Sequence, residues 1–492
     1  MAVFSIMVGA TMQSIDMTIA NVALPHMQGS LAATIDQIAW VLTSYIVASA
    51  VGTPLMGWLA IRYGQKLVLQ AALAGFTVSS LLCGIATSLP EMVLYRTLQG
   101  LASAALLPLA QAVMMRLYPR EYFAKAMAII GIGMMLGPIA GPTLGGYVTE
   151  VANWRWVFFI NLPLGVLAIS GIQIFLDEHR SEGDGYFDAF GFAMLIIAIG
   201  AFQLMLDRGE TKHWFSSTEI RLYAGMAALA FYMFVVQTVT ARRPFVSRAL
   251  FRDRNFVTGT LLFVVVSSNM MITVALQPPM LQNVMGYPVL TVGLLLAPRG
   301  VGTMMGMILS ARLMNRFDVR VIVIVGLAFA AWGLWDLSQL GIAISEWDIV
   351  RSAFIQGFGL GLVFVQLNTI AFATLPRPLH IEGATMFNLM RALGSSAGLS
   401  IAVALLAQYT QINHAELAAF ANPYNEALGL AGLPGFWSSL SDPAGLAMLN
   451  GEITRQAMMI SFINSYHWLM VAALVGVGLM LFVRLPPSPL RG

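Results

Sequence analysis

The chain has 492 residues, of which 58% are hydrophobic and only 10% are charged, and its formal net charge is +3. Soluble domains carry about 25% charged residues, so this composition excludes a soluble globular protein and indicates a chain that lies in a lipid bilayer. The single cysteine, Cys83, excludes an internal disulfide and a cysteine-based metal site. In a membrane protein the small positive charge gives no sign of a nucleic-acid partner, and we expect none.

Apolar runs of about 20 residues predict transmembrane helices, and fourteen of them follow one another along the chain. They predict an all-α integral membrane protein. The first run has no basic leader and no small-residue cleavage site, so we expect a retained helix rather than a signal peptide. The predicted spans cover residues 3–25, 37–60, 67–87, 91–116, 124–148, 154–176, 188–206, 218–240, 256–280, 289–311, 321–340, 348–375, 381–408 and 457–484.

Basic residues are unevenly distributed over the predicted connections. An even number of spans puts both termini on one side, and that side receives most of the lysines and arginines. Cytoplasmic loops are enriched in these residues, so we predict that both termini are cytoplasmic. The connections of the opposite side carry only Arg155, Arg208, Lys212, Arg221 and Arg455.

Span five, "GIGMMLGPIAGPTLGGYV", has a glycine at every fourth position. Such glycines line one face of a helix and allow a neighbouring backbone to approach closely. The two prolines each remove a helical hydrogen bond and predict a kink or a softened segment. Plain helix packing remains the alternative. The residues of this motif are Gly133, Gly137, Pro138, Gly141, Pro142, Gly145 and Gly146.

Two pairs of segments indicate an internal repeat. "LQGLASAALLPLAQ" (98–111) matches "IQGFGLGLVFVQLN" (355–368), and "GWLAIRYGQK" (57–66) matches "ARLMNRFDVR" (311–320). Because both pairs occur in the same order at nearly the same offset, they predict two six-helix halves related as parallel repeats. The predicted domains are an N-terminal six-helix bundle (1–176), a linker with two additional helices (177–255), and a C-terminal six-helix bundle (256–492) with a long outer segment (409–456).

Several of these motifs resemble those of a known family. "GPIAGPTLGG" resembles the span-five antiporter motif of major facilitator superfamily drug:proton exporters, and "LYRTLQGLASAALLPLAQ" resembles the family's span-four motif, centred on Arg96. "IDMTIANVALP" is similar to the span-one motif of the fourteen-span EmrB/QacA branch. "LFRDRNF" and "FNLMRALGSSAGLS" look like the EmrB-type inner-membrane pumps of tripartite exporters. The resemblance covers nearly the whole chain and implies a major facilitator fold.

The resemblance assigns a gating role to the loop between spans two and three, at Gly57, Arg62, Gly64 and Lys66. This loop usually carries an aspartate in the family, whereas the present chain has Ile61 at that position. A role that depends on that acid therefore does not transfer, and only the basic character of the loop is kept.

Asp16 places a carboxylate in span one, within "MQSIDMTIANVALP". It lies roughly 13 Å below Pro25, and Arg96 lies roughly 8 Å below Glu91, so a long arginine side chain can bridge them. One interpretation is a static buried ion pair. The other is proton coupling, in which Asp16 takes a proton from outside and releases it inside, while Arg96 adjusts how firmly it is held.

Further polar residues inside the spans are candidates to line a substrate cavity. Arg299 and Arg391 lie near mid-depth in spans ten and thirteen, where they pair with polar neighbours, attract an anionic substrate, or are structural. Flexible methionines suit a cavity that accepts many shapes. The candidate lining consists of Gln13, Asn21, Gln99, Gln111, Arg299, Gln356 and Arg391.

The resemblance and the intramembrane charges together predict a secondary active transporter, not an enzyme. We expect proton-coupled export of hydrophobic or amphipathic toxic compounds, antibiotics included, by alternating access. The sequence contains no GxxxxGK phosphate-binding loop and no metal-ligand cluster, so we expect neither ATP as energy source nor a cofactor. Two alternatives stay open: proton-coupled uptake of a small metabolite on the same fold, and a membrane assembly protein that does not transport.

The resemblance also implies partners for a chain in the bacterial inner membrane. These are an EmrA-like periplasmic adaptor and, through it, a TolC-like outer-membrane channel. The outer segment 409–456 is the candidate docking region. Its prolines, glycines and helix-length apolar patches predict short amphipathic helices that lie on the outer surface.

Overall fold

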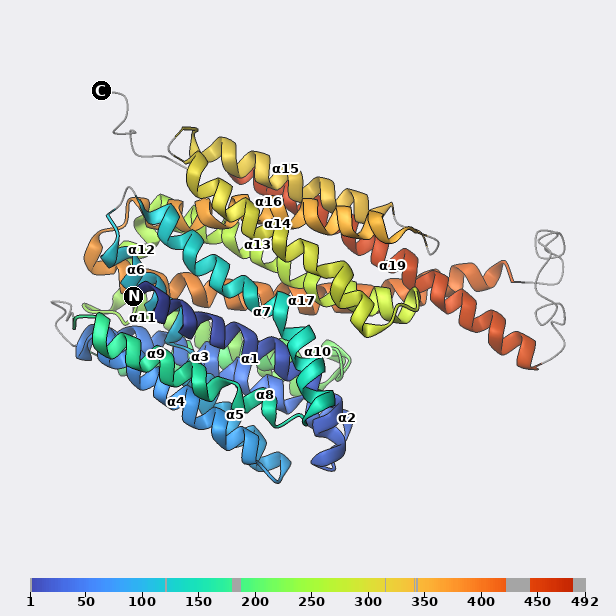
Figure 1. Ribbon diagram of the computed structural model, residues 1–492, viewed down its shortest axis with the longest axis horizontal. Helices are drawn as coiled ribbons and strands as arrows, with labels where there is room; N and C mark the ends of the chain where they lie inside the picture. The colour runs from blue at the N-terminus through green and yellow to red at the C-terminus, as the bar shows by residue number, and fades with distance from the viewer. Residues whose placement is uncertain are drawn as a thin grey trace.

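The computed structural model describes residues 2–119, 122–178, 187–314, 316–339, 341, 344–421 and 443–480. Within these ranges every regular element is a helix, and the long helices run side by side along the long axis of the molecule (Figure 1). Thirteen helices are long and apolar enough to cross a membrane, and the apolar stretch Phe123–Gly137 of a fourteenth is shorter. The prediction of a 14-helix, all-α, multi-pass membrane protein is confirmed.

The first half of the chain forms one group of packed helices, coloured blue to teal in Figure 1. In this group α1 packs against α7 and α9, and α5 packs between α3 and α4. Its elements are α1 (Ala2–Ser30), α2 (Ile35–Ile38), α3 (Trp40–Tyr63), α4 (Gln65–Ile85), α5 (Leu89–Ser103), α6 (Leu106–Leu117), α7 (Phe123–Val151), α8 (Trp156–Phe159) and α9 (Asn161–Phe175).

The predicted span 91–116 is divided into two helices, α5 and α6, at residues 104–105. Pro108 explains the break, because it has no N–H to donate to the carbonyl of Ala104. The helix resumes with the bond from Leu109 N–H to the carbonyl of Ala105 at 3.0 Å.

The later part of the chain forms a second group, and the inserted pair α10–α11 lies between the groups in sequence. Here α16 packs against both α14 and α15, and α17 packs against α13 and α19. The inserted pair consists of α10 (Ala189–Gly209) and α11 (Thr218–Thr240), with η2 (Trp214–Ser216) between them. The elements that follow are α12 (Arg248–Arg252), α13 (Arg254–Pro279), the π-helical turn η3 (Met280–Val284), α14 (Val289–Leu313), α15 (Val319–Ser338), α16 (Glu346–Ala373), η4 (Arg377–Leu379), α17 (His380–Ala419) and α19 (Pro443–Leu479).

The two groups meet through α7 with α14 and α16, and through α17 with α3 and α6. Gln111 on α6 donates to Asn368 Oδ1 at 3.3 Å and accepts from the Asn388 side-chain amide at 2.6 Å. Gln111 and Asn368 are positions that the sequence repeat equates. Equivalent residues touch where a two-fold axis passes between repeats, so this contact supports the proposed relation between the halves.

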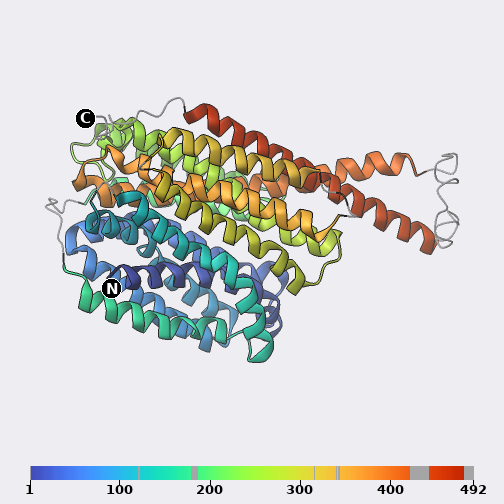
Figure 2. The same ribbon diagram turned by 45° about the horizontal axis from the view of Figure 1, so that its top comes forward.

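The prediction of short amphipathic helices over 409–456 is wrong for the described part of that segment. Helix α17 continues to Ala419 and α19 begins at Pro443, so the two helices form a hairpin that projects beyond the rest of the molecule (Figure 2). Residues 409–419 contain no proline or glycine to end the helix. The hairpin is also held laterally, by Asn413 to Ser461 Oγ and by His414 to Asn450 Oδ1, each at 3.0 Å. Residues 422–442 lie outside the described part of the chain.

Candidate functional site

Asp16 is enclosed by hydrogen-bond donors from two neighbouring helices. It is 1% exposed, and its Oδ2 lies 2.8 Å from Arg96 Nη1. Its Oδ1 accepts from the side-chain amides of Gln99 at 3.0 Å and Asn161 at 2.7 Å. An ionised carboxylate is an acceptor only, so three donors around one carboxylate match the charged state of Asp16.

Arg96 is fully buried and uses several partners besides Asp16. Its Nε donates to the carbonyl of Val41 at 3.1 Å, and Nη1 also donates to Gln99 Oε1 at 2.7 Å. Its Cζ lies 4.4 Å from the centre of the Tyr45 ring, where a cation–π contact is favourable. Both charges are therefore held in an enclosed site, and removing one partner of such a pair costs about 3–5 kcal/mol because the other stays buried and uncompensated.

Asn161 and Ser80 belong to this cluster, and the sequence analysis missed both. Asn161 Nδ2 donates to Ser80 Oγ at 2.9 Å, and Ser80 Oγ donates to the carbonyl of Phe158 at 2.9 Å. The sequence feature that could have identified Asn161 is its position as a lone amide among the apolar residues of "FFINLPLG". A buried amide needs partners, so Asn161 was a candidate of the same kind as Gln99.

The glycine face of α7 packs directly against α1, the helix that carries Asp16. A Cβ at Gly137 or Gly141 would overlap Ser14 or Thr18, respectively. Side chains of α1 also bond to the α7 backbone: Ser14 Oγ donates to the carbonyl of Met134 at 2.6 Å, and Thr18 Oγ1 to that of Gly137 at 3.0 Å. We call this contact the α1–α7 seam.

The ends of the motif differ from its centre. Gly133 and Gly145 also face α1: a Cβ on Gly133 would lie 3.0 Å from Thr11 Oγ1, and one on Gly145 would lie 3.4 Å from Ile19 Cα. A Cβ on Gly146, in contrast, meets no described residue within 4 Å. Gly146 therefore lies off the face of α7 that forms the seam. Helix α7 continues through Pro138 and Pro142, whose side chains lie outside the described part of the chain.

The predicted gating loop joins α3 to α4 through Gly64, which has φ +103°, a left-handed conformation that favours glycine. The Glu178 carboxylate accepts the backbone N–H groups of Lys66 at 3.3 Å and Leu67 at 3.2 Å, at the positive end of α4. The sequence predicts only that Glu178 lies at the start of the linker region (177–255), and this contact was missed. The acid at this loop thus comes from the connection after α9, not from position 61.

Other predicted loop residues also have identified neighbours. Gly57 lies against Thr385 of α17, so this glycine marks a contact between the two halves. Lys66 Nζ donates to the carbonyl of Gln173 at 3.0 Å, and the Arg62 guanidinium lies 5.2 Å from the Trp58 ring centre. The loop is therefore fastened to both α9 and α17.

The candidate cavity residues do not converge on one place. Gln99 belongs to the Asp16 cluster, and Gln111 lies at the contact between the halves. On α1, Gln13 is half-buried and Asn21 is exposed. In the second half, Gln356 donates to Thr273 at 3.0 Å and Arg299 is buried. Arg391 is half-buried, and its Nε has no hydrogen-bond partner among the residues that the structure describes.

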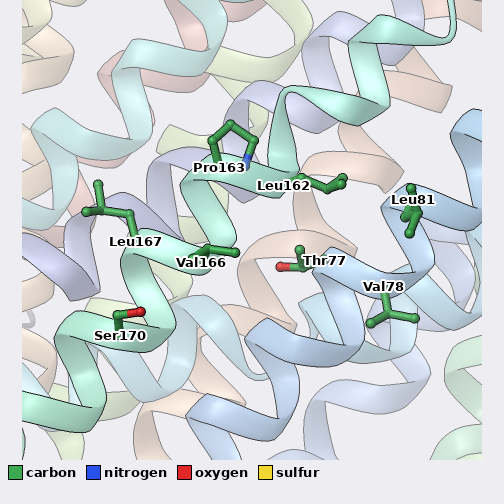
Figure 3. Close-up of a pocket in the computed structure, with 8 residues that line it drawn as sticks. All are labelled: Thr77, Val78, Leu81, Leu162, Pro163, Val166, Leu167 and Ser170. Carbon is green, nitrogen blue, oxygen red and sulfur yellow. The ribbon is translucent and has the colours of Figure 1, made fainter.

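A groove of about 630 Å³ lies elsewhere, between α4 and α9 (Figure 3). It is lined by apolar side chains such as Val78 and Val166, which are 56% and 61% exposed. None of the candidate cavity residues lines it. Exposed apolar side chains on a membrane helix face lipid, so we assign no site to this groove.

A comparison with known families decides the classification. The Major Facilitator Superfamily profile matches residues 6–399. This chain belongs to the Major Facilitator Superfamily. A solved structure shows the same fold: the human organic anion transporter MFSD10 (TETRAN) aligns over 96% of this chain and 98% of that chain, with a TM-score of 0.60 and 13% sequence identity.

Curated relatives align with almost the whole of this chain. Multidrug export protein EmrB of Escherichia coli (strain K12) is 33% identical over 491 residues, which is 96% of this chain and 93% of the relative. Probable multidrug resistance protein EmrY of the same strain is 30% identical, over 98% and 94%. Fatty acid resistance protein FarB of Neisseria gonorrhoeae is 32% identical, over 91% and 89%. The resemblance to the EmrB branch is confirmed.

Proposed function

We propose that this chain is a secondary active transporter, not an enzyme, that exports hydrophobic and amphipathic compounds in exchange for protons. The names of the EmrB and EmrY relatives support multidrug export. The observation that carries proton coupling is the burial of Asp16, whose carboxylate pairs with Arg96 inside the membrane helices. An ionisable residue kept at such a depth marks an ion or proton pathway in membrane proteins.

Helix α1 provides the proposed link between protonation and movement. Asp16 faces Arg96 on one side of α1, while Ser14 and Thr18 bond to α7 on the other. Protonation of Asp16 removes the negative charge that balances Arg96, so the arginine must change partners. A shift of α1 then alters the α1–α7 seam, whose small residues permit sliding without a large side chain in the way.

In the proposed cycle, the contact between the two halves is the second place at which the structure changes. Gln111, Asn368 and Asn388 join α6 to α16 and α17 near the ends of these helices that carry the basic loops. With both termini cytoplasmic and the chain in the inner membrane, this contact closes the cytoplasmic side. Opening it while the outer ends approach gives alternating access between the bundles 1–176 and 256–492.

The direction of transport is tested with purified protein in liposomes that contain a fluorescent hydrophobic compound. Under an imposed proton gradient, export predicts movement of the compound against proton flow. Movement with the protons indicates the uptake carrier, and no movement in either direction indicates the assembly protein.

The projecting hairpin supports a partner outside the membrane. Arg455 Nη1 lies 3.5 Å from the carbonyl of Val284, where η3 ends, so residues 443–454 of α19 extend beyond that level by about 18 Å. Exposed apolar side chains cover this part, including Leu446 (46%) and Met448 (55%). We propose that the hairpin docks an EmrA-like periplasmic adaptor, which connects the pump to a TolC-like outer-membrane channel.

Replacing residues 415–450 with a short Gly/Ser linker is expected to preserve transport in liposomes and to abolish drug resistance of whole Gram-negative cells. The reason is that the linker removes the projecting tip but leaves the membrane-spanning parts of α17 and α19. Drug survival and liposome transport are measured on the same variant.

The matched control shortens another outer connection, residues 211–216 between α10 and α11, with the same linker. This control should keep both activities. A hairpin-shortened chain that still protects cells and still co-purifies with the adaptor contradicts the docking proposal.

A further inference from the structure

One hydrogen bond of the Asp16 cluster has a counterpart in the second half. Gln99 donates to Asp16 across 83 positions at 3.0 Å, and Gln356 donates to Thr273 across the same 83 positions at 3.0 Å. The sequence repeat equates Gln99 with Gln356, so Thr273 stands where the first half has its carboxylate. The second half keeps the amide and replaces the acid with a hydroxyl.

Arg299 brings a positive charge to this acid-free copy. A Cβ on Gly357, next to Gln356, would overlap the Arg299 carbonyl, so the two backbones touch. Arg299 is 8% exposed, and the buried Tyr466 of α19 is one of its neighbours. Among the described residues no aspartate or glutamate forms an ion pair with it.

Two nitrogen atoms of Arg299, Nε and Nη2, are buried and lack a hydrogen-bond partner within the described part of the chain. They form one edge of the guanidinium, and this chain uses the same edge elsewhere to hold carboxylates. Arg351 binds Asp336 at 3.1 and 2.8 Å, and Arg455 binds Glu452 at 2.8 and 2.8 Å. Planar forks of this kind recognise carboxylates in a bidentate manner.

Further unbonded polar atoms lie on the neighbouring helices. Gln277, one turn after Thr273 on α13, is fully buried, and among the described residues neither its Nε2 nor its Oε1 has a partner. The same holds for Gln356 Oε1. Buried polar atoms are normally paired, so one unpaired donor (Gln277 Nε2) and two unpaired acceptors (the Oε1 atoms of Gln277 and Gln356) on α13 and α16 are unusual. Apolar side chains of the same helices, including Leu276 and Leu295, are buried close by.

We infer that Arg299 is the recognition residue for an anionic substrate, an amphipathic compound with a carboxylate or a similar acidic group. The acidic group of the substrate accepts hydrogen bonds from Nε and Nη2 of Arg299, and the neighbouring apolar side chains contact the apolar part of the substrate. The substrate thereby supplies the negative charge that Asp16 supplies in the first half. This inference rests on the proposed export function, because the compound bound at Arg299 is taken to be the exported substrate.

Equilibrium binding to the purified full-length chain in detergent tests the site. Dodecanoate and its neutral counterpart dodecanol are the probes, and we expect the chain to prefer dodecanoate by about tenfold, as a hydrogen bond to a charged group provides. Arg299→Gln should abolish this preference while leaving dodecanol binding unchanged. Arg351→Gln is the matched control, because that arginine already holds Asp336, and it should keep the preference.

A second variant keeps the test decisive if Arg299→Gln does not fold. Thr273→Asp places a carboxylate at the position equivalent to Asp16, and it should lower dodecanoate affinity by about tenfold through repulsion of the probe. A folded Arg299→Gln or Thr273→Asp chain with the wild-type preference overturns the inference. Binding requires no proton gradient, so the two proposals fail separately. If the chain prefers dodecanoate but transports nothing, the export function alone is overturned. If the chain transports but does not prefer dodecanoate over dodecanol, the anion site alone is overturned.

Discussion

Asp16→Asn is expected to reduce proton-driven efflux to the level of empty liposomes while exchange of substrate down its own gradient continues. Asparagine cannot carry a proton through a transport cycle, whereas substrate binding does not require one. Transport is measured in proteoliposomes under an imposed pH gradient, with equal amounts of folded protein in each sample. Asp207→Asn is the matched control, since Asp207 is an exposed acid on α10 that bonds to Thr43, and it should transport like the wild type.

The static ion pair makes a different prediction, and a double variant separates the two. Asp16→Asn alone leaves Arg96 buried and uncompensated, which costs about 3–5 kcal/mol of stability. Asp16→Asn with Arg96→Gln removes both charges and should restore folding. A purely structural pair predicts that coupled efflux returns with folding, whereas proton coupling predicts that it does not. Wild-type coupled efflux in either variant removes Asp16 from the mechanism.

The helical spans and the Asp16–Arg96 approach were predictable because each depends on a one-dimensional property. Hydrocarbon thickness determines how long an apolar run must be, and helical rise converts sequence position into depth. Depth alone placed Arg96 within reach of Asp16, and the structure gives 2.8 Å between them. The internal repeat was predictable for a similar reason, since equal offsets in sequence are visible without coordinates.

The remaining contacts depend on which helices are neighbours, and this is not encoded in the depth of a residue. Asn161 reaches Asp16 across 145 positions, and Glu178 reaches the start of α4 across 112 positions. Glu178 does not stand out in the sequence, because acids near helix ends are common, and Asn161 stands out only as a lone amide whose partner the sequence does not indicate. The hairpin was misjudged for another reason: polar residues end a membrane span but do not end a helix, and α17 continues to Ala419.

Gly137→Leu is expected to stop transport, because position 137 lies at the centre of the α1–α7 seam. Even a Cβ there would overlap Ser14, and the bonds from Ser14 to Met134 and from Thr18 to Gly137 hold the helices at that distance. Overpacking of this kind costs about 1–3 kcal/mol, which a folded chain can survive. Substrate transport and substrate binding are therefore measured together with the yield of folded protein.

Gly146→Leu provides the matched control on the same helix, because a Cβ at Gly146 meets nothing within 4 Å. It should fold, bind and transport like the wild type. If the seam serves packing alone, Gly137→Leu loses folded protein, and the molecules that remain folded transport normally. If the seam moves during the cycle, Gly137→Leu yields folded chains that bind substrate and do not transport it, since α1 can no longer slide on α7 when Asp16 takes up its proton. A well-folded Gly137→Leu chain with wild-type transport contradicts both interpretations and leaves the glycine face without a role in coupling.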